Sequence, residues 1–151
     1  MRVVIQRVSE ASVTIDGKKV AEIRKGLLVL LGITDADTQE DIDYLVRKIA
    51  NLRIFNDENQ VMNLSLKDVN ADAIVVSQFT LFANVKKGNR PSYINASKPN
   101  IAIPLYEKFV ANLELEIQKE IQTGRFGADM KVRLLNDGPV TIIIDSKNRD
   151  F

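Results

Sequence analysis

The sequence predicts a single domain of the α+β class, in which a β-sheet packs against two long helices. Short runs rich in β-branched residues alternate with polar turns and predict the strands. Two longer segments carry apolar residues at helical spacing. The chain has 151 residues, which suits one domain, and neither a repeat nor a shift in composition marks a boundary. We place the domain at residues 1–145 and a polar C-terminal tail at residues 146–151.

The N-terminal part of the chain predicts a hairpin followed by a buried strand. Val3–Val8 and Ser12–Ile15 are rich in β-branched side chains, which favour extended structure. Asp16-Gly17 supplies turn chemistry before a further strand at Val20–Ile23, so these segments predict a hairpin. Leu27–Ile33 is apolar apart from Gly32 and far shorter than the roughly 20 residues of a membrane span, so it predicts a buried strand.

The first helix is predicted to begin after Thr38. Threonine is a favourable N-cap, and the acidic residues around it suit the positive end of a helix dipole. The apolar residues that follow at helical spacing are Ile42, Leu45, Val46, Ile49 and Leu52. We expect this face to pack on the sheet. A short edge strand at Arg53–Phe55 follows, and Met62–Ser65 leads into a loop.

The middle of the chain predicts a second buried strand, a long loop and a second helix. Ala73–Leu81 is strongly apolar, although polar residues interrupt its end. The polar connection Asn84–Asn100 carries four basic residues, and long loops in compact domains are often functional. The helix is predicted over Ile101–Gln122, with Pro104 in its first turn and Gly124 at its C-terminal cap.

Two further strands, Lys131–Leu135 and Val140–Asp145, are predicted on either side of Asn136–Pro139. All four residues of that segment have turn chemistry, so a turn is the simplest interpretation. A Gly-Pro bond can also be cis at modest cost, and a fixed cis bond could aim two carbonyl oxygens the same way, as acceptors for an ammonium group. We expect the tail Ser146–Phe151 to fray.

The composition excludes several kinds of chemistry. Lys and Arg total 21 against 20 for Asp and Glu, a net charge of +1, so any contact with nucleic acid must be local. Cys and His do not occur, which excludes disulfides, zinc sites built on these residues, and Ser-His or Cys-His relays. We expect neither a metal nor another cofactor. The N-terminal sequence turns polar too soon for a secretory signal, so we expect a cytoplasmic protein.

Three groups of residues are candidates for chemistry. Ser77 and Thr80 carry hydroxyls, but a hydroxyl nucleophile needs a base, and neither His nor a Ser-x-x-Lys pattern is present; pairing with backbone groups is the simpler interpretation. Gly124–Gly127 matches a GxxG loop that clamps nucleotides, although a helix cap and a turn explain both glycines. The basic residues of the long loop could meet phosphates or form a solvated surface.

Five short segments, distributed along nearly the whole chain, match the pattern of one known family. The most specific of them are Ser77-Gln78-Phe79-Thr80-Leu81 and Asn136-Asp137-Gly138-Pro139-Val140-Thr141. The others are Gln6-Arg7-Val8, Gly88-Asn89-Arg90-Pro91 and Thr123-Gly124-Arg125-Phe126-Gly127-Ala128-Asp129-Met130. In this order and at this spacing the chain resembles the D-aminoacyl-tRNA deacylase family, also called D-tyrosyl-tRNA deacylases.

The resemblance implies a homodimer of α+β subunits, each with a mixed, mostly antiparallel, curved sheet and two main helices. It implies hydrolysis of the ester between a D-amino acid and the 3′ acceptor end of tRNA, a chiral proofreading. If selection works by excluding L side chains, glycyl esters, such as glycyl-tRNA mischarged on tRNA-Ala, should also be hydrolysed. Two alternatives remain from the residues alone: a non-catalytic module that binds aminoacyl or nucleotide ends, and a structural dimer in which Gly138-Pro139 is only a turn.

The resemblance also implies roles for individual residues. The adenosine and ester pocket is formed by Ser77, Gln78, Phe79 and Thr80, and Ala102, Phe126 and Met130 line it. Gly138 and Pro139 of one subunit enter the active site of the other as the chiral selector, and Arg7 braces them. An L side chain would then point into backbone, whereas a D side chain points to open space. Many D-amino acids should therefore be accepted.

An aminoacyl ester is already activated, so the protein need only position it, stabilise the oxyanion and admit water. We expect backbone N–H groups around Phe79 and Thr80 to stabilise the oxyanion, with the neighbouring ribose 2′-hydroxyl helping to activate water. Lys86, Lys87 and Arg90 are expected to make weak, salt-dependent contacts with tRNA phosphates.

Overall fold

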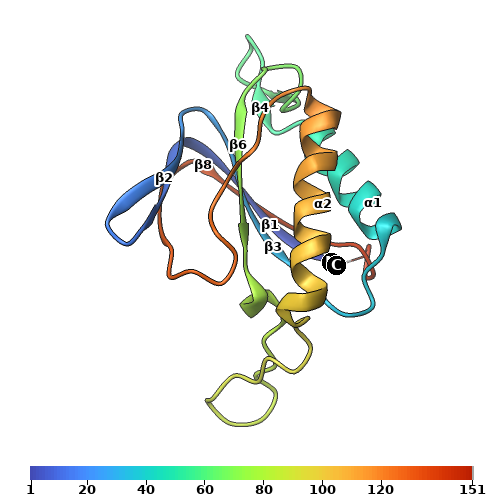
Figure 1. Cartoon of the computed structure of the whole chain (residues 1–151). Coiled ribbons are helices and arrows are strands. Elements are labelled where there is room, and N and C mark those ends of the chain that lie inside the picture. Colours follow the sequence, from blue (N-terminus) through green and yellow to red (C-terminus); the bar gives the residue numbers. More distant parts are fainter. Residues whose placement is uncertain (151) are drawn as a thin grey trace.

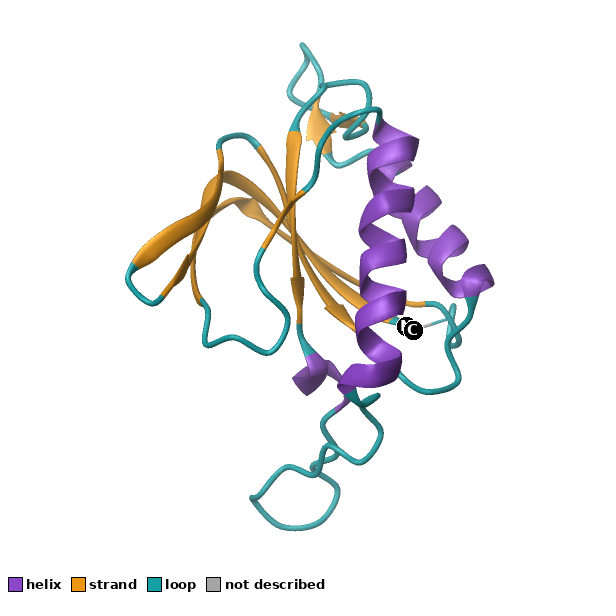
Figure 2. Ribbon diagram, in the orientation of Figure 1, coloured by secondary structure: helices purple, strands orange, loops and turns teal. Residues whose placement is uncertain are grey.

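The computed structural model describes residues 1–150 as a single α+β domain (Figure 1). Two helices, α1 (Gln39–Asn51) and α2 (Pro99–Ile117), lie side by side on one face of a curved sheet. Figure 2 shows the strands farthest from the helices bending away from them. The predicted fold class is therefore confirmed. Within residues 1–150 no helix is long and apolar enough to cross a membrane.

The main sheet has six strands, and its order is β2-β1-β3-β6-β7, with β8 paired to β1. Their bounds are β1 (Arg2–Ile15), β2 (Lys18–Ile23), β3 (Gly26–Gly32), β6 (Asp72–Ser77), β7 (Gln122–Thr123) and β8 (Lys131–Asp145). The pairs of β6 with β3 and β7 are parallel, whereas the three pairs of β1 are antiparallel. A second small sheet joins β4 (Phe55–Asn56) to β5 (Met62–Leu64).

Two hydrophobic cores lie on opposite faces of the sheet, because alternate side chains of β3 point to opposite sides. Leu27, Val29 and Leu31 pack in the first core, beneath the helices. Leu28 packs in the second core, where the curled ends of β1 and β2 close over the other face. The even-numbered side chains of β8 pack against both: Val140, Ile142 and Ile144 against the first core, Val132 and Leu134 against the second.

A bulge interrupts the pairing of β8 with β1. Thr141 pairs with Gln6 and Asn136 pairs with Val8, so the segment Asp137–Val140 stands opposite a single residue of β1. Asn136 closes the bulge, because its Oδ1 accepts from the Val140 N–H at 2.8 Å and its Nδ2 donates to the Val140 carbonyl at 3.2 Å. Asn136–Pro139 is thus a bulge within one strand rather than a turn between two.

Other boundaries also differ from the sequence prediction. The hairpin turn at Asp16-Gly17 is confirmed, but its first strand is continuous through residues 9–11 because β8 pairs along it. The second helix ends at Ile117, not at Gln122, because Gln118 adopts a left-handed conformation with φ of 54°. Ile121 keeps the helical spacing in sequence but enters the core from the extended segment before β7. Met62–Leu64 is a strand, not the start of a loop.

The prediction that the chain frays beyond Asp145 is wrong for Ser146 and Lys147. The Ser146 hydroxyl is buried and donates to Asp41 Oδ1 at 2.7 Å, and Lys147 Nζ donates to Asp41 Oδ2 at 2.8 Å. Burial of Asp41 opposes its ionisation, but these bonds and one from the Thr38 backbone outweigh burial and hold its pKa well below the usual range. Phe151 lies outside the described residues.

Candidate active site

A cavity of about 270 Å³ opens beyond the carboxyl ends of the parallel strands β3 and β6. Its lining residues come from the ends of these strands, from the start of α2 and from the segment before β8. They are Leu31, Ile33, Val76, Ser77, Gln78, Phe79, Ser97, Ala102, Phe126, Gly127, Ala128, Asp129, Met130 and Val132. Six of the residues that the resemblance assigned to one pocket therefore meet here.

Backbone pairing brings Ser77 and Gln78 to the cavity. Ser77 pairs with Leu31 in the parallel ladder, and the Gln78 N–H donates to the Leu31 carbonyl at 2.8 Å. The strand predicted to continue to Leu81 ends here, and the chain turns into the 3₁₀ helix η1 (Phe79–Phe82). The side-chain amide of Gln78 then donates to Thr80 Oγ1.

The first turn of η1 leaves two backbone donors without a protein acceptor. The Leu81 N–H donates to the Gln78 carbonyl at 3.2 Å, but the N–H groups of Phe79 and Thr80 donate to no acceptor within residues 1–150. Such unpaired donors are normal at the start of a helix and are available to an anionic group. Phe79 lines the cavity and is exposed, whereas Thr80 is half-buried and is not among the lining residues.

Phe126 is held by a buried tyrosine of α2. The rings of Tyr106 and Phe126 meet edge to face with centroids 6.1 Å apart, and the Tyr106 hydroxyl donates to the Val75 carbonyl at 2.7 Å. Burial raises the pKa of Tyr106 well above its usual value, so its hydroxyl stays a neutral donor. Ala102 lies one helical turn before Tyr106 and is buried at the cavity. Its small side chain leaves the space open.

Met130 fits the cavity because residue 124 is glycine. A Cβ at Gly124 would lie closer to Met130 Sδ than real Cβ atoms ever come, while Val13 Cγ1 would be its next neighbour at 3.6 Å. The thioether therefore packs directly on backbone. This close approach, rather than the helix cap predicted for Gly124, accounts for the glycine.

Arg7 and the bulge of β8 form a second element outside this cavity. Arg7 is only 6% exposed, and its Nε donates to the Asp137 carbonyl at 2.8 Å. Its Nη1 donates to the Ile54 carbonyl at 2.6 Å, which ties the bulge to the β4 region. Gly138 and Pro139 are exposed and the peptide bond between them is cis. Neither of them lines the cavity of the same chain.

The family model described as D-Tyr-tRNA(Tyr) deacylase matches residues 4–145, a range that includes both the cavity and the bulge. The chain belongs to the D-aminoacyl-tRNA deacylase family. A protein of that name from Flavobacterium johnsoniae is 71% identical over 150 residues, which cover 99% of this chain and 100% of that protein. Another of that name, from Parabacteroides distasonis, is 63% identical with the same coverage.

Solved structures share the fold of this deacylase-family chain. The c-Myc DNA unwinding element binding protein is 42% identical with a TM-score of 0.91, and the match covers 96% of this chain and 98% of that one. A probable eukaryotic D-amino acid tRNA deacylase is 18% identical with a TM-score of 0.81, covering 95% of this chain and 97% of that one. At 18% identity the likeness concerns the fold alone.

The polar groups on the cavity wall supply hydrogen bonds rather than a buried base. Asp129 is the one carboxylate among the lining residues, and it is exposed and paired with Lys131 at 2.8 Å. Ser97 also lines the cavity, and its hydroxyl donates to Asp35 Oδ1 at 2.5 Å. Within residues 1–150 no cluster of acidic residues is arranged to hold a metal ion.

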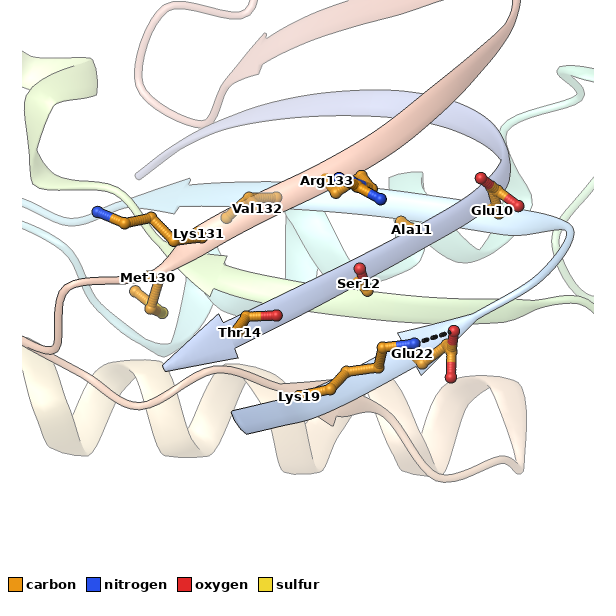
Figure 3. Close-up of a pocket in the computed structure, with 10 residues that line it drawn as sticks. All are labelled: Glu10, Ala11, Ser12, Thr14, Lys19, Glu22, Met130, Lys131, Val132 and Arg133. Carbon is orange, nitrogen blue, oxygen red and sulfur yellow. Dashed lines mark hydrogen bonds and ion pairs between the residues drawn. The ribbon is translucent and has the colours of Figure 1, made fainter. Parts of the chain in front are cut away.

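A larger hollow of about 710 Å³ lies over β1, β2 and the start of β8 (Figure 3). Charges of both signs surround it, and Lys19 is paired with Glu22 at 2.6 Å across its edge. The hydroxyls of Ser12 and Thr14 lie on its floor (Figure 3). Of the residues in the family-resembling segments only Met130 lines it, so the smaller cavity is the candidate active site.

The structure separates the residues that the sequence assigned to the deacylase site into three places. Ser77, Gln78, Phe79, Ala102, Phe126 and Met130 line the cavity, and Arg7, Gly138 and Pro139 form the separate bulge element. Lys86, Lys87 and Arg90 are exposed on the loop after η1. Sequence reasoning missed Ser97 and Tyr106: neither lies in a recognisable motif, and both act through tertiary contacts.

Proposed function

We propose that two copies of this chain form a homodimer that hydrolyses the ester of D-aminoacyl-tRNA, releasing the free D-amino acid and tRNA. The observation that carries the proposal is the pair of unpaired N–H groups of Phe79 and Thr80 beside a cavity without a buried base. Membership of the deacylase family supports the reaction and the substrate class.

The terminal adenosine and the ester occupy the cavity, between the Ser77–Phe79 segment and the residues Ala102, Phe126 and Met130. Water attacks the ester carbonyl, and the Phe79 and Thr80 N–H groups stabilise the tetrahedral oxyanion. The ribose 2′-hydroxyl of the substrate assists in activating the water. Because the ester is already activated, positioning and oxyanion stabilisation suffice and the reaction requires no metal or cofactor.

Selection against L-amino acids comes from the partner subunit's bulge. The carbonyl oxygens of Gly138 and Pro139 accept hydrogen bonds from the substrate α-ammonium, and the backbone beside them leaves no room for an L side chain. The support is that both residues are exposed, that Arg7 anchors the adjoining Asp137 carbonyl, and that neither residue reaches the cavity of its own chain. In this proposal a second copy of the chain brings them to the site.

The decisive experiment compares D- and L-tyrosyl-tRNA under single-turnover conditions with and without the protein. Rapid loss of the D ester beside a surviving L ester is the expected result. Equal loss of both esters would mean an esterase without the selector. Loss of neither would leave a binding module. We further propose that the enzyme acts in the cytoplasm as a proofreading enzyme and that it also hydrolyses glycyl esters, which have no side chain to exclude.

A further inference from the structure

The segment that builds one wall of the cavity differs in charge from the rest of the chain. From Ala73 to Tyr106 the sequence contains no Asp or Glu but four basic residues: Lys86, Lys87, Arg90 and Lys98. The remainder of the chain then carries 17 basic and all 20 acidic residues, from totals of 21 and 20. A nearly neutral protein therefore presents one positively charged segment, next to its cavity.

Residues 84–92 of this segment form a projecting loop, which Figure 1 shows extending beyond η1. The loop is closed at its base by two backbone bonds between Asn84 and Ser92, at 2.7 and 3.0 Å. Lys86, Lys87 and Arg90 are exposed on it, and within residues 1–150 no carboxylate pairs with any of the three. Their charges are available to a polyanion.

An aromatic corner joins the base of this loop to the mouth of the cavity. The rings of Phe79 and Tyr93 meet nearly at right angles, with centroids 4.9 Å apart and planes 74° apart. Phe79 is 53% exposed and Tyr93 is 40% exposed, so both rings present surface to solvent. Phe79 also lines the cavity, whereas Tyr93 does not. The Tyr93 ring therefore lies just outside the space that holds the ester.

We propose that the Phe79–Tyr93 corner binds the base of the nucleotide that precedes the esterified adenosine, with that base stacked on the Tyr93 ring. Exposed aromatic rings beside unpaired cations are the usual means of holding single-stranded RNA. The cations of the 84–92 loop contact the phosphates of the same strand. This inference rests on the proposed function, because the terminal nucleotide must occupy the cavity for its neighbour to reach Tyr93.

The test compares two substrates with the same reacting end, D-tyrosyl-tRNA and the 3′-ester of D-tyrosine with adenosine, which has no preceding nucleotide. Tyr93→Leu should lower kcat/KM on the tRNA roughly 5- to 100-fold more than on the adenosine ester, the range expected for one lost stacking interaction. Tyr93→Phe keeps a ring and should remain within about twofold of the wild type. Ile94→Ala removes an exposed apolar neighbour without a ring and should leave the ratio of the two activities unchanged.

Equal losses on both substrates, or no loss on the tRNA, would overturn the proposal. A Tyr93→Leu protein that is monomeric in light scattering, when the wild type is a dimer, would also overturn it. That result would show that a second copy of the chain, and not RNA, packs on the corner. Replacing Lys86, Lys87 and Arg90 by Gln should flatten the salt dependence of tRNA hydrolysis, and an unchanged slope contradicts the phosphate contacts. A wild-type protein that cleaves neither ester would refute the proposed function instead.

Discussion

The guanidinium of Arg7 is anchored to the backbone of the β8 bulge, where its Nε donates to the Asp137 carbonyl at 2.8 Å. Because the same side chain also donates to the Ile54 carbonyl at 2.6 Å, one buried arginine joins three parts of the chain at the element that we assign to chiral selection. This arrangement and the cavity beyond the ends of β3 and β6 lead to four predictions, and the buried Asp41 leads to a fifth.

Replacing Arg7 by Lys should weaken both the fold and the selector. Lysine has a single ammonium group and lacks the planar, forked donors of a guanidinium. It therefore cannot donate to both carbonyl oxygens, and one buried acceptor loses its partner. We expect a loss of about 1–3 kcal/mol in the free energy of unfolding, measured in urea. Hydrolysis of D-tyrosyl-tRNA should fall at conditions where the variant is folded. The control Arg53→Lys, at an exposed arginine that also donates to a carbonyl, should change neither quantity much.

Gly138→Ala should abolish selective hydrolysis. Gly138 has φ of +147°, and a Cβ there would lie 2.7 Å from Val140 Cγ2 and 3.2 Å from Arg7 Nη2. The strain costs about 1–3 kcal/mol and shifts the carbonyl oxygens proposed to hold the ammonium. Gly17→Ala is the matched control, because φ is also positive but open space surrounds the position. It should lose stability while keeping full activity per folded molecule; loss of activity in both variants would contradict the assignment.

Gly124→Ala should narrow the active-site cavity. The new methyl displaces Met130, a flexible side chain, so we expect a higher KM for D-tyrosyl-tRNA with little change in the unfolding midpoint. The double variant Gly124→Ala, Met130→Ala should regain activity relative to the single Gly124 variant, because the clash is gone. Additive losses in this double-mutant cycle would show that the two residues act independently.

Thr80→Ala should slow single-turnover hydrolysis less than about tenfold. The proposed oxyanion donors are backbone N–H groups, which the substitution retains, and loss of one such donor would cost about 10²- to 10³-fold. The hydroxyl only accepts a bond from the Gln78 amide. A fall to the uncatalysed rate would instead favour Thr80 as the nucleophile, and a covalent D-aminoacyl adduct on Thr80 should then be detected by mass spectrometry of the wild-type protein.

Stability should fall in acid because of Asp41. A folded-state pKa below the ordinary 3.8 means that the contribution of Asp41 is complete above that pH. It is then lost as the pH decreases toward the folded-state pKa. Asp41→Asn should cost about 1–3 kcal/mol at pH 7 and make the dependence below pH 4 shallower. Asp43→Asn, on the same helix but with an exposed carboxylate, is the control in urea titrations at pH 7 and pH 3.

The sequence predicted the fold class, both helices, the hairpin and the β3 and β6 strands, because each has a clear periodicity or turn signal. It did not predict that Asn136–Pro139 is a bulge, because turn residues suit a bulge and a hairpin equally, and only pairing with β1 distinguishes the two. The predicted helix was too long at its C-terminal end because Ile121 continues the helical spacing. An isoleucine buried in the core looks the same in the sequence whether a helix or an extended segment carries it.

The residues of the site were predictable only where they belong to recognisable motifs. The motifs alone assign Ser77, Gln78, Phe79 and Met130 to one substrate pocket, and in the structure these four residues line one cavity. Ser97 was not predicted, since a lone serine in a loop carries no signal of its bond to Asp35. The tail was expected to fray because it is polar, yet its polar groups are what bind it to Asp41.

The length of the β8 bulge is constrained by folding as much as by chemistry. On one side of it even-numbered side chains such as Ile142 face the first core, and on the other side Val132 and Leu134 face the second. Deleting one residue from the bulge would exchange inward and outward positions, placing Lys131 and Arg133 where apolar side chains now pack. A one-residue insertion or deletion in the bulge should therefore disrupt the packing of β8, whereas the exposed 84–92 loop should tolerate such a change.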